Sequence, residues 1–99
     1  DDLPRGLDLC VFDFGVNAGT GRSAKYLQRL IGTTVDGGIG PNTIRAVYNY
    51  VDEVGLDGAI KNFQKTRQEY YEKLKTFETF GRGWTRRVTE TTELAISMV

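Results

Sequence analysis

Apolar residues recur along the chain at intervals of three and four positions, the spacing that places them on one face of an α-helix. In residues 21–31, for example, Leu27, Leu30 and Ile31 share a face. No segment alternates apolar and polar residues for long enough to predict a sheet. The chain is therefore expected to be all-α, with short connections between about five helices, over residues 4–16, 21–31, 41–54, 57–74 and 83–98.

Glycine and proline mark the boundaries between these segments. Pro41 suits a first helical turn, and Gly55 suits the left-handed residue that ends a helix. Between the second and third segments, Asp36 precedes two glycines and predicts a turn in which its carboxylate accepts backbone N–H bonds. Ile39, which stands between two glycines of this connector, is expected to plug the core. Its replacement by alanine would then destabilise the domain by ~2–4 kcal/mol.

The composition is that of one globular domain spanning residues 1–99, with 39% hydrophobic and 26% charged residues. Thirteen Lys and Arg balance thirteen Asp and Glu. This zero net charge argues against a nucleic-acid binder that works by bulk positive charge, so no nucleic-acid partner is expected. No apolar run approaches the ~20 residues that span a bilayer, and membrane insertion is not expected either. The first residues lack the basic start and apolar stretch of a signal peptide.

The inventory of reactive side chains is small. There is no histidine and only one cysteine, Cys10, which excludes an internal disulfide, ordinary nucleophilic triads and the usual transition-metal ligands. Neither a metal nor another cofactor is expected. Asp13 stands inside an apolar helix between Phe12 and Phe14. Two interpretations are open: a capped or paired acid that organises the following glycine turn, or a carboxylate at the edge of a cleft.

Arginines appear in two further settings. Arg67 falls within the apolar stripe of its segment, so its stem is expected to be buried while its guanidinium stays wet. Arg82, Arg86 and Arg87 cluster at the start of the last segment. They form either a solvated helix face or a site for anionic groups.

Three separated motifs resemble those of a known family. Residues 27–32 (L-Q-R-L-I-G), followed by Asp36-Gly37 and residues 40–43 (G-P-N-T), are similar to the L-Q…G…D-G…G-P-x-T pattern of small helical peptidoglycan-binding modules. Residues 11–19 and 79–88 extend the resemblance. Together they resemble the C-terminal, peptidoglycan-binding part of the bacterial and phage N-acetylmuramidases of glycoside hydrolase family 108, some of them described as secretion activators.

The resemblance implies a lysozyme-like, mostly helical protein that cleaves between N-acetylmuramic acid and N-acetylglucosamine. The family's catalytic glutamate belongs to an E-G-G-[YF] motif upstream, which is followed by a G-G-x-T segment. Neither motif occurs here: the first glutamate is Glu53, and no glutamate precedes two glycines. The chain is therefore expected to be either the C-terminal, binding half of such an enzyme or a free-standing binding module, with no catalytic residue of its own. Its expected partners are peptidoglycan glycan strands and the N-terminal catalytic segment of a parent chain.

Four residues are candidates for contact with the glycan. Lysozyme-like clefts are lined by a helix that ends in an F-x-x-N-x-G turn, which residues 14–19 resemble. Asn17 offers an amide donor and acceptor to a sugar, although it could bond its own backbone instead. Asp13 lies one helical turn before it. Trp84 could stack on an apolar sugar face or belong to the core, and Tyr48 is a further amphipathic candidate.

Two other functions remain open. A helical protein-interaction module with no glycan role is compatible with the zero net charge. A DNA-binding helix-turn-helix over residues 21–50 would use Arg22, Lys25, Arg29 and Arg45, but the nine-residue connector exceeds the usual turn of three or four residues. Retention on insoluble peptidoglycan distinguishes the first hypothesis from the others. The sequence assigns no cellular compartment.

Overall fold

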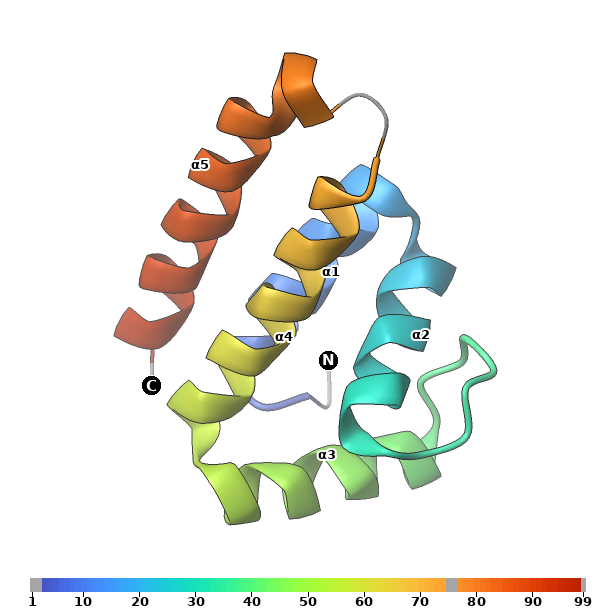
Figure 1. The fold of residues 1–99 in the computed structure, drawn as a ribbon. Helices are drawn as coiled ribbons and strands as arrows, with labels where there is room; N and C mark the ends of the chain where they lie inside the picture. The colour runs from blue at the N-terminus through green and yellow to red at the C-terminus, as the bar shows by residue number, and fades with distance from the viewer. Residues whose placement is uncertain (1–2, 75–76, 99) are drawn as a thin grey trace.

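Five helices joined by short connections make up the chain in the computed structural model (Figure 1). The structure describes residues 3–74 and 77–98, and side chains outside residues 77–82. No strand occurs within these ranges, so the predicted all-α class is confirmed. The helices are α1 (Leu7–Ala18), α2 (Thr20–Ile31), α3 (Pro41–Val54), α4 (Leu56–Glu72) and α5 (Phe77–Ser97).

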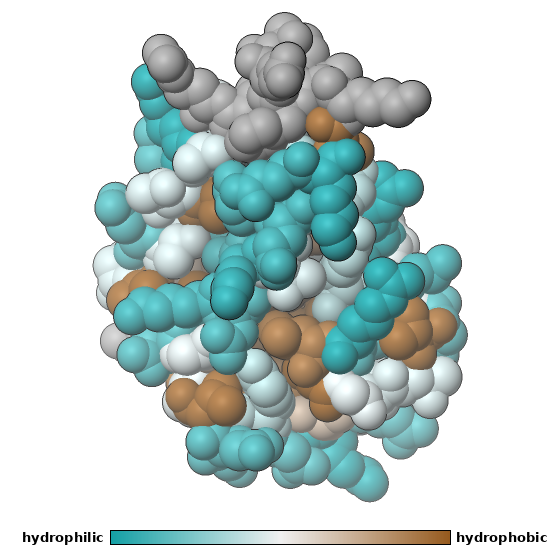
Figure 2. Space-filling view, viewed as in Figure 1, coloured by the Kyte–Doolittle hydropathy of each residue, from teal (hydrophilic) through white to brown (hydrophobic). Residues whose placement is uncertain are grey.

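Helix α4 is the centre of the arrangement and contacts each of the other four helices. Figure 1 shows α5 beside α4 and running in the opposite direction, α1 behind them, and α3 across the lower end of the molecule. The connector between α2 and α3, residues 32–40, loops out on the side of α2. Hydrophilic residues predominate on the face seen in Figure 2, and apolar residues lie in separated patches.

Two helix starts differ from the prediction. Helix α1 begins at Leu7 rather than near Pro4, whose carbonyl accepts the first helical bond from the Asp8 N–H at 3.0 Å. Helix α5 begins at Phe77, well before the expected start near Gly83. Glycine inside a helix costs only about 1 kcal/mol relative to alanine, so glycines that suggested a boundary are tolerated within a helix of 21 residues.

The core is built around the ring of Phe14, which is fully buried at the middle of the helices. Its ring centroid lies 5.6 to 6.0 Å from those of Tyr26, Phe63, Tyr70 and Tyr71, with the rings tilted or edge-on as aromatic pairs prefer. Cys10, also fully buried, packs into the same cluster. Burial raises the pKa of its thiol to about 12, so this cysteine stays protonated and unreactive.

The expected role of Ile39 is wrong. Its side chain is 37% exposed, whereas Leu27 on α2 and Val47 on α3 are fully buried in the core. Glycines on both sides allow the connector to pass over the surface, so Ile39 is not driven inward. We now expect Ile39→Ala to cost less than about 1 kcal/mol, against about 2–5 kcal/mol for Leu27→Ala. Urea midpoints of the two variants test this, and equal losses would contradict it.

Candidate functional site

A buried glutamine holds the connector between α2 and α3. The side-chain nitrogen of Gln28 donates to Asp36 Oδ1 at 2.9 Å, to the Gly38 carbonyl at 3.0 Å and to Thr43 Oγ1 at 3.1 Å. Its side-chain oxygen accepts the N–H groups of Asp36 at 3.1 Å and Gly37 at 2.9 Å. These bonds join the three parts of the L-Q…D-G…G-P-x-T pattern in one network. The pattern therefore encodes a loop that is held by hydrogen bonds to one buried side chain.

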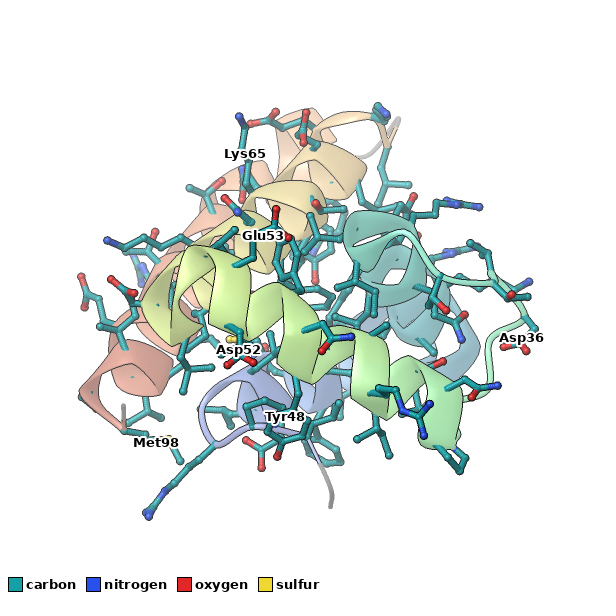
Figure 3. The ribbon with its side chains drawn as sticks, turned by 90° about the horizontal axis from the view of Figure 1, so that it is seen from below. Asp36, Tyr48, Asp52, Glu53, Lys65 and Met98 are labelled. Carbon is teal, nitrogen blue, oxygen red and sulfur yellow. The ribbon has the colours of Figure 1, made fainter. Side chains whose placement is uncertain are left out.

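Asp36 behaves as the sequence predicts. Its Oδ1 accepts the Gly38 N–H at 2.9 Å, which closes the turn. The hydrogen bonds from the Gly38 backbone and the Gln28 side chain lower the pKa of the Asp36 carboxyl. Asp36 is exposed at the outer end of the loop, as Figure 3 shows.

Asp13 is the most densely bonded acid in the described residues. Its Oδ2 lies 2.7 Å from Arg67 Nη2, and Arg87 Nε lies 3.1 and 3.2 Å from its two oxygens. Arg87 Nη2 also bonds Oδ1, and Thr91 Oγ1 donates to Oδ2 at 3.3 Å. Burial would raise the pKa of Asp13, but the hydrogen bonds from Arg87 and Arg67 outweigh it and hold that pKa below its ordinary value. The paired acid is the interpretation that the structure supports, although its partners lie on α4 and α5 instead of in the glycine turn.

Arg67 contradicts the expectation of a wet guanidinium. Its side chain is fully buried, and its guanidinium lies 5.5 Å from the ring centroids of both Phe14 and Tyr71. Its Nε donates to the Tyr71 hydroxyl at 3.0 Å. The carboxylate of Asp13 supplies the opposite charge that allows a guanidinium to remain inside the protein.

The other three candidates lie in different surroundings. Asn17 is exposed, and its Nδ2 donates to the Asp13 backbone carbonyl at 3.2 Å, which is the local bond that the sequence left open. Trp84 is half-buried and stacks on Tyr71 with centroids 5.1 Å apart. Through Tyr71 and Arg67, Trp84 is thus connected to Asp13. Tyr48 is 47% exposed on α3, which packs on α2 and α4; Figure 3 shows it far from Asp36.

Arg87 connects the Asp13 cluster to the surface. Its side chain is 54% exposed although it binds a nearly buried carboxylate. A shallow pocket of about 260 Å³ lies beside it, lined by residues of α1 and α5: Leu9, Asp13, Arg87, Glu90, Thr91 and Leu94. Arg82, expected to belong to the same basic cluster, has a side chain outside the described residues.

Large apolar side chains are exposed along α1 and α5. Phe12 is 67% exposed, Val16 is 63% exposed, and Leu94 is 55% exposed. Phe12 and Val16 are one helical turn apart on α1, and Leu9 and Leu94 line the pocket beside Arg87. We call these four residues the α1–α5 apolar face.

Two further hollows lie on α2 and between α4 and α5. The first has a volume of about 370 Å³ and is lined by Gly21, Arg22, Lys25, Tyr26 and Arg29. We call it the α2 pocket. The second is a groove of about 500 Å³, bordered mainly by polar residues such as Lys61, Lys65, Gln68 and Thr89, with Val88 among them.

In the part of the chain that the structure describes, no three carboxylate or cysteine side chains gather as metal ligands would. Nor does any helix there combine the length and the apolar character that crossing a bilayer requires.

Residues 22–89 match the family described as "Predicted Peptidoglycan domain". The matched span contains the Gln28 network, most of the α2 pocket and both arginines that bind Asp13. The chain belongs to this family. The predicted peptidoglycan-binding class is therefore confirmed. No curated protein matches the sequence.

Among solved structures, this chain is similar to SagA of Brucella abortus. The two share 37% sequence identity with a TM-score of 0.90, and the match covers 99% of this chain and 54% of that one. The chain thus spans about half the length of SagA. The five-helix arrangement is common to both proteins, which agrees with the confirmed all-α fold.

Proposed function

We propose that this domain is the peptidoglycan-binding half of an N-acetylmuramidase-like enzyme of the kind found in glycoside hydrolase family 108. The observation that carries the proposal is the family match over residues 22–89, joined to a likeness with a chain about twice as long. In this proposal the catalytic glutamate lies in an upstream segment of the parent chain. The 99 residues supply contacts with the glycan and a surface against which that segment packs.

The state of Asp13 supports binding without hydrolysis. A glycosidase needs a carboxyl group that is protonated at the working pH in order to donate a proton to the leaving oxygen. Asp13 is the most enclosed candidate, and the guanidinium groups of Arg67 and Arg87 keep it ionised. Its oxygens already accept hydrogen bonds from several donors. It serves better as the anchor that fixes Arg87 at the surface.

The proposed glycan contacts follow from exposure. Asn17 uses one amide N–H on the helix backbone, which leaves the rest of its amide for N-acetyl and hydroxyl groups. Arg87, held by Asp13, presents a half-exposed guanidinium on the neighbouring helix. Trp84 and Tyr48 offer partly exposed rings for sugar faces.

The α1–α5 apolar face is the proposed docking surface for the upstream catalytic segment. Exposed apolar side chains of this size that lie together commonly mark an interaction surface. The match covers 54% of the SagA chain, so nearly half of SagA lies outside the matched part. A segment of that size in the parent of this chain would be large enough to cover the face. Seated there, it would place its catalytic residue beside Asn17 and Arg87.

The 99 residues alone are expected to bind cell walls without clearing them. Asn17→Ala should weaken sedimentation with purified peptidoglycan by about two- to tenfold for each neutral hydrogen bond of about 0.5–1.5 kcal/mol that is lost. Neither the unaltered chain nor Asp13→Asn is expected to show lytic activity. Turbidity of a peptidoglycan suspension measures lysis. Clearing by the unaltered chain that disappears in Asp13→Asn would make Asp13 catalytic and contradict the proposal.

A further inference from the structure

The α2 pocket is lined by residues from one face of helix α2. Arg22, Lys25, Tyr26 and Arg29 follow the i, i+3, i+4, i+7 spacing, so their side chains project on the same face. The ring of Tyr26 is half-buried, while the three cations around it are exposed. The pocket therefore has an aromatic wall and a cationic rim.

The arginines of this rim are held in place by aromatic rings. The guanidinium carbon of Arg22 lies 5.0 Å from the ring centroid of Tyr70, and its Nη1 donates to the Tyr70 hydroxyl. The guanidinium carbon of Arg29 lies 5.3 Å from the ring centroid of Tyr26. Cation–π contacts of this kind restrict long side chains before any ligand arrives. Less conformational freedom is then lost on binding.

No carboxylate among the described residues neutralises these cations. Within the described ranges, both ion pairs end on Asp13, and no carboxylate lies within ion-pairing distance of Arg22, Lys25 or Arg29. The chain as a whole has zero formal net charge, so three unpaired cations around one pocket are a local excess. Such a pocket favours a small anion.

We propose that the α2 pocket binds carboxylate groups of the peptide stems of peptidoglycan. The inference rests on the proposed function and names a part of its ligand. Stem peptides carry free carboxylates beside small apolar side chains, and arginine recognises a carboxylate through paired N–H donors. In this arrangement the carboxylate lies between Lys25 and Arg29, and an apolar group of the stem packs on Tyr26. Nucleic acid is disfavoured, because a phosphate backbone needs an extended basic surface and a surplus of positive charge.

The test compares two forms of one polymer. The first form is intact, acid-treated, insoluble peptidoglycan. The second form is the glycan strands alone, from which an amidase has removed the peptide stems and which are then coupled to beads. The variant is Lys25→Gln with Arg29→Gln. The matched control is Lys61→Gln with Lys65→Gln, which removes two exposed cations from α4. All four altered residues are exposed, so circular dichroism and urea midpoints are expected to match the unaltered chain.

The unaltered chain is expected to bind intact peptidoglycan about tenfold or more tightly than stem-free strands, since charge-assisted pairs are the strong hydrogen bonds. The pocket variant should lose that difference, and the control should keep it within about twofold.

Equal binding of both polymers by the unaltered chain, unchanged in the variant, would overturn the inference and leave the proposed function standing. Failure of the unaltered chain to bind either polymer would overturn the proposed function itself. Retention on a duplex DNA fragment that depends on Lys25 and Arg29 would also overturn the inference.

Discussion

Arg67→Ala is expected to lower the free energy of unfolding by about 3–5 kcal/mol, the cost of breaking a buried ion pair from one side. Arg67 is fully buried, and its removal leaves the nearly buried Asp13 with Arg87 as its remaining counter-charge. The contacts with the rings of Phe14 and Tyr71 are lost as well. Urea unfolding followed by circular dichroism measures the change.

Two variants serve as controls for this prediction. Arg87→Ala removes the partner whose side chain is 54% exposed, so its loss is expected to be clearly smaller, about 1–2 kcal/mol. Asp13→Leu combined with Arg67→Met replaces both charges by apolar groups and should recover much of the stability lost in Arg67→Ala. An Arg67→Ala variant as stable as Arg87→Ala would contradict the account of the core.

The same ion pairs predict a pH dependence. Because the pKa of Asp13 in the folded protein lies below its unfolded value near 3.8, the stabilisation is complete above that pH. It is lost as the pH falls through the lower pKa of the folded state, where the carboxylate takes up a proton. Below about pH 4 the stability difference between the unaltered chain and Arg67→Ala should therefore shrink. A difference that stays constant into strong acid would show that charge pairing contributes little.

The second large effect is expected for Gln28. Gln28→Leu keeps the volume of the side chain but removes its bonds to the connector, including those to the backbone N–H groups of Asp36 and Gly37. A loss of about 2–4 kcal/mol is expected, because partly buried donors and acceptors are left without partners. Faster hydrogen exchange should accompany it, confined to the connector. Asp36→Ala, altered at the exposed end of the network, is the control and should cost clearly less than Gln28→Leu. Equal losses would contradict the central role of Gln28.

Helix positions could be predicted where local signals are strong. Helix α3 runs over Pro41–Val54 as expected, because Pro41 starts a helix well and Gly55 ends it with a positive φ of 83°. Helix α2 likewise ends at Ile31, before Gly32 in the left-handed region. Helix α5 was misplaced at its start, since glycine is a weak barrier when packing holds a helix together.

Partners distant in sequence explain what could not be predicted. Asp13 was singled out correctly as an unusual acid, yet Arg87 lies 74 residues away, and no local rule connects the two. Arg67 was expected to keep its guanidinium in water, since the periodic pattern shows its burial but not its counter-charge. Gln28 carried a signal that was available: it follows Leu27 directly on an amphipathic helix and precedes an Asp-Gly turn whose backbone N–H groups need acceptors.

The central claim is that these 99 residues bind peptidoglycan and leave it intact. The most direct measurement is sedimentation of the purified chain with insoluble, acid-treated peptidoglycan over a range of concentrations, with turbidity recorded on the same samples. The account predicts saturable retention in the pellet and constant turbidity. Full recovery of the chain in the supernatant at every peptidoglycan concentration would contradict it.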